Sequence, residues 1–309
     1  MAMATDSCAA LTTQGSVWTF CPSLGADVLF CVLFALTTVA HIAQMIWYKK
    51  WYSSVIVISA ALQTTSYIIR GINIQQPSQS TLYIIWFVLM MIAPIWLNAY
   101  VYMVLGRMIY NFTTEATLLH IKAWTFGMIF VVLDIIAFFV QVIGAIVAAS
   151  SSIMGGNLGS VGLDIYMGGC GFQQLCILGF LTYTILFHKR LRSISEVEAK
   201  RRATILIFVE YIIIVLITTR VVFRLVQYSQ GFKSDISNHE AYEYALDSLP
   251  MFAGLVLLNI YHPGRLMPGR EADIPSHKTR RMAARNGSPM GGRLAESKYT
   301  LVENPQADE

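Results

Sequence analysis

The stretch TILIFVEYIIIVLITTRVVFRLVQ, residues 204–227, is a nearly unbroken apolar run with two arginines close to its end. It exceeds the ~20 residues that a helix needs to cross a bilayer. Six similar runs occur, at 25–47, 53–73, 80–104, 121–148, 160–187 and 243–262. Only 13% of the chain is charged, against about 25% in soluble domains. Strand-period alternation is absent, so the sequence predicts an all-α membrane protein, a bundle of seven transmembrane helices.

The basic residues lie almost entirely on one side of this pattern. Eighteen of the 22 Lys and Arg fall in the C-terminal tail or in the loops after the first, third and fifth runs, and only Lys233 falls on the other side. The positive-inside rule therefore predicts the N-terminus outside and the C-terminus in the cytosol. The expected organisation is an extracytoplasmic arm (1–24), a transmembrane domain (25–262) and a cytosolic tail (263–309). The tail is rich in proline and mixed charge, and we expect it to be disordered.

The arm and the loops carry few other signals. Cys8 and Cys21 both lie in the arm, where a disulfide is chemically allowed, and their spacing leaves the pairing open. The glycosylation sequons at Asn111 and Asn286 are both predicted to be cytosolic, so neither should be used.

Charged residues inside the predicted spans are the strongest clue to function. The span interiors contain Arg70, Arg220 and Arg224 against Asp134, Asp164, Glu210 and Asp247. Each of these charges would cost roughly 2.5–3.5 kcal/mol if left unpaired at a helix centre. They must therefore pair, snorkel to the interface or line a wet cavity, and Glu210, near the cytosolic end, is expected to snorkel. Helical spacing places the polar residues in stripes, such as Gln63, Tyr67 and Arg70 on one face.

These stripes predict a polar cavity in the outer half of the bundle, open toward the outer leaflet. Its expected substrate-binding residues are Arg70, Arg220, Arg224, Asp134, Asp247, Tyr67, Gln63, Gln141, Gln173, Gln227 and Asn98. The competing interpretation is a buried ion-pair network that only fixes how the helices pack.

Two prolines interrupt the runs beside these residues. Pro94 removes an amide and frees the carbonyl of Met90, and Pro250 does the same for Leu246, next to Asp247. Broken helices at polar residues suit ligand sites and gates, although static kinks have the same signature.

Several segments resemble a known family and occur in the family's order. They are His41-Ile-Ala-Gln44, Tyr67-Ile-Ile-Arg70, Ala93-Pro94, Tyr102-Met103, Gly106-Arg107, Asp134 to Gln141 with Gly144, Gly162, Gly169, Gln173, Arg220-Val-Val-Phe-Arg224, Gln230-Gly231, Glu240, Tyr244, Asp247 and Pro250-Met251. Together they resemble the fungal lipid-translocating exporter family, which includes aminocholesterol-resistance proteins, sphingoid-base exporters and a protoporphyrin transporter. The resemblance covers about residues 20–270.

The resemblance implies the transport of lipid-like amphiphiles and resistance to them. Sphingoid bases, phospholipids, sterol-like toxins and porphyrins are the candidates, and the plasma membrane is the expected location, with an internal membrane as the alternative. Gln63 and Gln227 stand where the family usually has Glu, so we expect an outer cluster that is more cationic than the family pattern.

Other seven-span classes fit the sequence less well. Span three ends Leu105-Gly106-Arg107-Met108, without the acidic-Arg-Tyr triplet of G-protein-coupled receptors, and span seven holds no Schiff-base lysine. His41 lies on the cytosolic side, whereas Asp164 and Asp247 lie on the outer side, which disfavours a metal-dependent hydrolase. We therefore expect no enzyme activity, no metal, no cofactor and no nucleic-acid partner, although His41 retains an alternative interpretation as an axial ligand to a tetrapyrrole.

The identity of the ligand stays open at this stage. Three arginines favour an anionic head group, and Asp134, Asp164 and Asp247 suit a sphingoid ammonium equally. A seven-span lipid receptor or sensor of a non-GPCR type is the alternative function. The sequence does not predict the oligomeric state.

Overall fold

The structure, a computed structural model, describes residues 8–113, 116–154, 158–192, 196–229, 236, 239–269 and 271–285. Seven helices in this part of the chain are long and apolar enough to span a membrane, which confirms the predicted fold. Their elements are α2 (Leu24–Tyr48), α3 (Ser54–Gln75), α4 (Ser80–Phe112), α5 (Ala123–Met154), α6 (Leu158–Leu191), α7 (Val197–Ser229), and a seventh span built from α8 (Glu240–Glu243), η2 (Tyr244–Ser248), α9 (Leu249–Ile260) and α10 (Pro263–Leu266).

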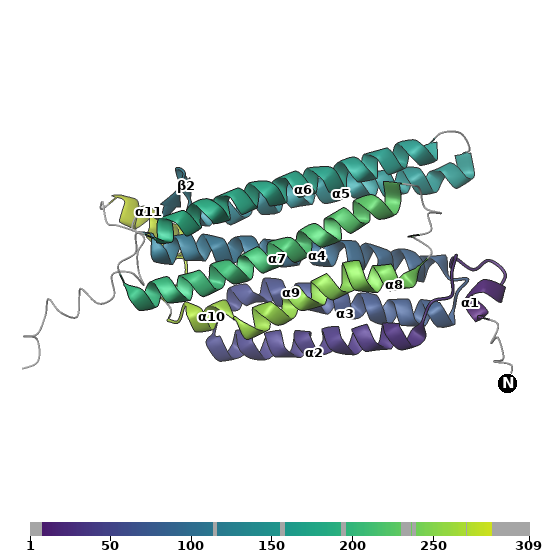
Figure 1. Ribbon diagram of the computed structural model, residues 1–309, viewed down its shortest axis with the longest axis horizontal. Coiled ribbons are helices and arrows are strands. Elements are labelled where there is room, and N and C mark those ends of the chain that lie inside the picture. The colour runs from purple at the N-terminus through teal and green to yellow at the C-terminus, as the bar shows by residue number, and fades with distance from the viewer. Residues whose placement is uncertain are drawn as a thin grey trace, which may run out of the picture.

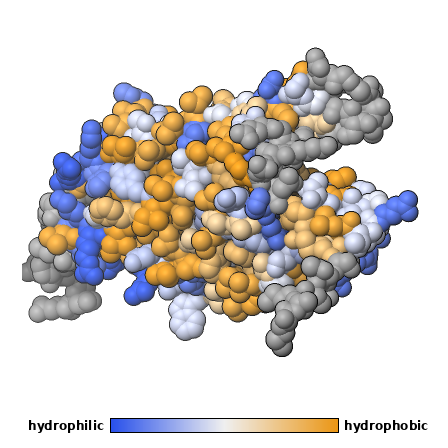
Figure 2. All heavy atoms as spheres, turned by 45° about the vertical axis from the view of Figure 1, so that its right-hand side comes forward, coloured by the Kyte–Doolittle hydropathy of each residue, from blue (hydrophilic) through white to orange (hydrophobic). Residues whose placement is uncertain are grey.

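The short elements mark the two ends of the bundle (Figure 1). The helix α1 (Ala9–Thr12) lies at one end, which we call the arm end, and α11 (His277–Arg285) lies at the other, which we call the tail end. The hairpin of β1 (Thr117–Leu118) and β2 (Ile121–Lys122) is also at the tail end. Figure 2 shows apolar residues across the middle of one face and hydrophilic residues toward its ends, as expected for a bundle that spans a bilayer.

The seventh span is interrupted where the sequence places a proline. The segment Tyr244–Ser248 is a π-helix, and α9 begins at Leu249, so that Pro250 occupies its first turn. Proline is tolerated there because its missing N–H would be unsatisfied in any case. The interruption turns Asp247 and Ser248 into the bundle, where both side chains are buried.

The first part of the tail packs against the bundle, contrary to the expectation that disorder begins at residue 263. The Lys50 ammonium donates to the Gly269 carbonyl at 2.6 Å and to the Asp273 carboxylate at 2.9 Å. The Asn111 side chain donates to the Ala272 carbonyl at 3.0 Å. These contacts hold the segment in place, above all because the buried Lys50 ammonium needs acceptors. Asn111 is itself fully buried, whereas Asn286 lies outside the described residues.

Glycines allow α5 and α6 to pack closely along their length. An added Cβ on Gly144 would overlap the backbone of Tyr166, and one on Gly162 would overlap the backbone of Ala148. Small residues at such positions let transmembrane helices approach each other and gain van der Waals contact.

We predict that Gly162→Ala lowers the melting temperature in detergent, because overpacking a tight contact costs about 1–3 kcal/mol. Gly168→Ala is the matched control, since a Cβ there has nothing within 4 Å. The control should be neutral or slightly stabilising because alanine is the better helix former. Equal melting temperatures for the two variants would contradict the close approach of α5 and α6.

Candidate functional site

Arg70, near the arm end of α3, is surrounded by acidic side chains from two other helices. Its guanidinium lies 2.9 Å from Glu240, 3.6 Å from Asp27 and 3.8 Å from Glu243, and it also donates to the Tyr244 hydroxyl. Only 2% of the Arg70 side chain is exposed. Three carboxylates around one buried cation leave this part of the molecule with an excess of negative charge.

Aromatic rings enclose the same guanidinium. Its central carbon lies 5.6 Å from the centre of the Trp18 ring, 5.4 Å from Trp86 and 5.0 Å from Tyr244. Trp18 stacks on Trp86 with ring centres 6.0 Å apart. Cation–π contacts at desolvated sites contribute about 2 kcal/mol or more, so the N-terminal arm, which supplies Trp18, is part of the Arg70 environment.

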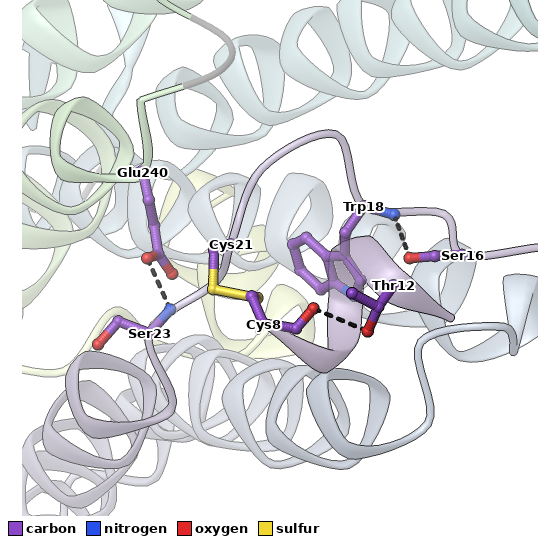
Figure 3. The surroundings of a disulfide bond; sticks show 7 residues. All are labelled: Cys8, Thr12, Ser16, Trp18, Cys21, Ser23 and Glu240. Atoms are coloured by element: carbon purple, nitrogen blue, oxygen red, sulfur yellow. Dashed lines mark hydrogen bonds between the residues drawn. A yellow bond between two sulfur atoms is a disulfide. The ribbon is translucent and has the colours of Figure 1, made fainter. Parts of the chain in front are cut away.

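A disulfide closes the arm into a loop (Figure 3). Cys8 and Cys21 are bonded, which settles the pairing that the sequence leaves open. Two residues beyond Cys21, the Ser23 amide donates to the Glu240 carboxylate at 2.8 Å. The disulfide therefore shapes the arm itself, whereas the Ser23–Glu240 contact and Trp18 attach it to the bundle.

Replacing both Cys8 and Cys21 with serine should loosen the arm without unfolding the spans. The bond joins two residues 13 apart in the sequence, and a disulfide across such a loop stabilises the folded state by about 3 kcal/mol. Hydrogen–deuterium exchange should become faster in residues 8–23 and stay unchanged in the middle of α4. Cys31→Ser, at a free cysteine of α2, is the control. Unchanged exchange in the arm would show that Trp18 packing alone holds it.

The other two arginines share one carboxylate deeper in the bundle. Asp247, from the π-helical segment, accepts from the Arg224 guanidinium at 2.6 Å and forms a second ion pair with Arg220. The Arg220 guanidinium also donates to the Met90 carbonyl at 3.1 Å. This is the carbonyl that Pro94 was predicted to free, so the proline supplies an acceptor to a buried arginine from another helix.

Two cavities adjoin this arginine pair. The smaller, about 20 Å³, is lined by Gln141, Gln173, Arg220 and Arg224, among others, and has room for about one water molecule. The Gln141 amide donates to the Gln173 carbonyl at 3.0 Å.

The larger cavity, about 160 Å³, lies toward the arm end. It is lined by Arg224, Gln227 and Glu243 together with the arm residues Val17, Trp18, Thr19 and Phe20 and the α4 residues Tyr83, Trp86 and Phe87. Arg224 borders both cavities and therefore connects the region under the arm with the interior.

An apolar groove lies near the other side of α7. Its volume is about 770 Å³, and side chains of α6, α7 and the start of the seventh span line it, including Leu178, Val222 and Leu246. Ligand sites commonly measure about 300–1,000 Å³, and a hydrocarbon chain matches this lining.

The structure divides the predicted site into separate clusters. Asp134 accepts from Asn98 at 2.9 Å and from Tyr102 at 3.0 Å and does not join the arginines. Tyr67 forms a hydrogen bond with Ser248 beside Asp247, and Gln63 is buried on the same face of α3. The expectation of one cavity shared by all these residues is therefore not met.

One further expectation needs correction. Glu210 does not snorkel, because it is only 2% exposed. Three acids, Asp27, Glu240 and Glu243, surround Arg70 at the arm end, and the comparison of this cluster with the family pattern stays a prediction. Asp27 was not identified from the sequence as a partner of Arg70. Asp27 is the one acid in the first apolar run, and that isolated position is the signal that indicates a partner for it.

His41 is fully buried in α2. No group of three or more His, Cys, Asp and Glu side chains that could hold a metal ion occurs among the residues that the structure describes.

Comparison with known proteins identifies related sequences. The sequence model of the family described as "RTA1 like protein" matches residues 56–270. A probable lipid transporter, atnI, of Emericella nidulans is 36% identical over 277 residues, which is 84% of this chain and 71% of that protein. Protoporphyrin uptake protein 1 of Saccharomyces cerevisiae is 28% identical, over 64% of each chain.

A third relative is the sphingoid long-chain base transporter RSB1 of Saccharomyces cerevisiae, which is 23% identical over 82% of this chain and 75% of its own. No solved structure matches.

Proposed function

The chain belongs to the RTA1-like family, and on that premise we propose that it moves lipid-like amphiphiles across the membrane that holds it. The relatives named above are a probable lipid transporter, a protoporphyrin uptake protein and a sphingoid long-chain base transporter. The ligand is moved and not chemically converted. The plasma membrane is the proposed location, with the N-terminal arm outside.

One observation carries the role of the site: two buried arginines share a single carboxylate beside a cavity. Arg220 and Arg224 both pair with Asp247, so this group holds one positive charge in excess. A phosphate or carboxylate head group can accept hydrogen bonds from the two planar guanidinium groups in the same way as Asp247 does. A head group that reaches the 160 Å³ cavity meets Arg224 first.

The apolar groove complements this polar site. It borders α7, the helix that carries both arginines, and extends to Leu246, the residue before Asp247. An amphiphile needs a polar pocket for its head and an apolar surface for its chain, and the same turns of α7 border both. We propose that head and chain occupy these two regions during transport.

The arginine-to-lysine series tests the head-group role. Arg220→Lys and Arg224→Lys keep the charge but lose the planar fork, and one charged hydrogen bond contributes about 1.5–3 kcal/mol. Each variant should fold and bind protoporphyrin or a fluorescent phosphatidylcholine about 10- to 100-fold more weakly. Binding by the purified protein and thermal unfolding are the two measurements.

Two further variants are the controls for this series. Arg70→Lys should lower the melting temperature instead, because acids and aromatic rings of the protein already surround that guanidinium. Arg201→Lys, at a side chain that is 72% exposed, should change neither quantity. Full binding by both Arg220→Lys and Arg224→Lys would leave Asp247 and its arginines with a purely structural role.

The proposed orientation can be tested directly. An epitope tag on the N-terminus should be accessible to antibody on intact cells, and a tag on the C-terminus only after permeabilisation, because basic residues remain on the cytosolic side. The reverse pattern would overturn the orientation.

Net movement of a fluorescent lipid in proteoliposomes separates a transporter from a lipid sensor, which would bind the lipid without moving it.

A further inference from the structure

Two carboxyl groups in the interior of the bundle lack a cationic partner. Asp134 on α5 is 1% exposed and Glu210 on α7 is 2% exposed. None of the ion pairs among the described residues includes either of them. A buried, unpaired carboxylate costs several kcal/mol, whereas the protonated form costs much less. Ionisable groups in such positions are characteristic of proton and ion pathways.

The two groups lie at similar depths from the tail end. Asp134 is 11 residues from the start of α5 and Glu210 is 13 residues from the start of α7, which correspond to about 17 and 20 Å along each helix. Tyr102, which donates to Asp134, lies 10 residues before the last residue of α4, Phe112, or about 15 Å from it along the helix. Tyr102 donates to Asp134 at 3.0 Å and also interacts electrostatically with Glu210.

Unused acceptors point to a ligand that donates a hydrogen bond. One oxygen of Asp134, one oxygen of Glu210 and the carbonyl oxygen of Asn98 are buried without a hydrogen-bond partner among the described residues. Asn98 is 1% exposed and directs its amide at Asp134. A proton on Asp134 converts one acceptor into a donor in this set and reduces the number of unsatisfied groups.

A line of hydrogen-bonding groups leads from Tyr100 toward the tail end. The Tyr100 hydroxyl lies 3.3 Å from the Ser53 hydroxyl, and the interaction of Tyr100 with Glu210 is electrostatic. Ser53 lies 3.4 Å from Nε2 of His262. Because His262 Nδ1 accepts from the Gly264 amide at 3.0 Å, the neutral ring carries its proton on Nε2.

Titratable and charged side chains of the neighbouring elements interact electrostatically with this line of groups. They are Tyr100, Tyr102 and Arg107 from α4, Cys176 from α6, His41 from α2, and Lys50 and Tyr52 from the turn between α2 and α3. α9 supplies no titratable side chain. Arg107 is the cation that acts on Tyr100, and it lies 3.6 Å from the centre of the Tyr52 ring.

We propose that Asp134 and Glu210 are the proton-binding groups of this protein, and that proton transfer between them and the tail-side water through Tyr100, Ser53 and His262 drives amphiphile movement. A proton taken up at His262 Nδ1, in place of the Gly264 contact, lets Nε2 release its own proton to Ser53. Ser53 passes one to Tyr100, and Tyr100 passes one to the Glu210 carboxylate. The intervening groups end neutral, and one proton from the water ends on Glu210.

The inference rests on the proposed transport function for its coupling step but not for its proton site. Infrared difference spectra of the purified protein between acidic and alkaline buffer test the site alone. The wild type should show a protonated-carboxyl C=O band that weakens in Asp134→Asn and in Glu210→Gln. Asp164→Asn, at an exposed carboxyl of α6, is the matched control and should keep the band. A band of wild-type strength in both site variants would overturn the assignment.

Coupling is tested in proteoliposomes with a fluorescent phosphatidylcholine, whose head group does not titrate near neutral pH. Each coupled proton should shift the distribution of the probe about tenfold per pH unit of gradient, the factor that corresponds to 1.4 kcal/mol. Glu210→Gln should lose this shift and still exchange labelled for unlabelled lipid. Exchange by the wild type without any response to the gradient would overturn coupling alone, whereas absence of exchange would overturn the transport function and leave the infrared result to decide the site.

Discussion

The sharing of Asp247 by Arg220 and Arg224 is the interaction on which the arrangement of the helices depends. A guanidinium inside a bilayer needs acceptors from the protein, because the surrounding hydrocarbon offers none. Both prolines in the central spans serve this requirement. Pro94 frees the Met90 carbonyl for Arg220, and the π-helical segment before Pro250 turns Asp247 toward both arginines. Three spans, α4, α7 and the seventh, are thereby joined at one point, and none of them can rotate without exposing a charge.

The polar groups form a graded series along the bundle. At the arm end, Arg70 is enclosed by three acids and three aromatic rings, which leaves it no free direction. In the middle, two arginines share one acid beside small cavities. Toward the tail end, Asp134 and Glu210 take part in none of the ion pairs among the described residues. The electrostatic balance therefore changes along the bundle from an excess of acids, to an excess of cations, to carboxyl groups without an ion-pair partner in this part of the chain. A fold that needed charges only for stability would have no reason to leave the last two kinds unbalanced.

The sequence was sufficient to predict the features that depend on one helix at a time. Apolar run length gave the seven spans, and the proline rule gave the free carbonyl of Met90. Helical spacing gave faces but not the rotation of each helix against its neighbours, which is why Asp134 was wrongly grouped with the arginines. The partners of Arg70 were missed for the same reason, since Asp27 and Glu240 come from spans at the two ends of the chain. Composition suggested that the tail separates at residue 263, but the need of Lys50 for acceptors keeps residues up to 273 on the bundle.

Glu243 links the first two levels of this series, and its position bears on the kind of head group that fits. It lies 3.8 Å from Arg70 and lines the cavity under the arm together with Arg224. The cavity therefore presents a cation and an anion a short distance apart, with Gln227 between them in sequence. An anionic group can compete with Asp247 for Arg224, and an ammonium can compete with Arg70 for Glu243. Each exchange replaces one buried ion pair by another, so a ligand can enter without leaving a protein charge unpaired, which is the condition that a low-dielectric site imposes on binding.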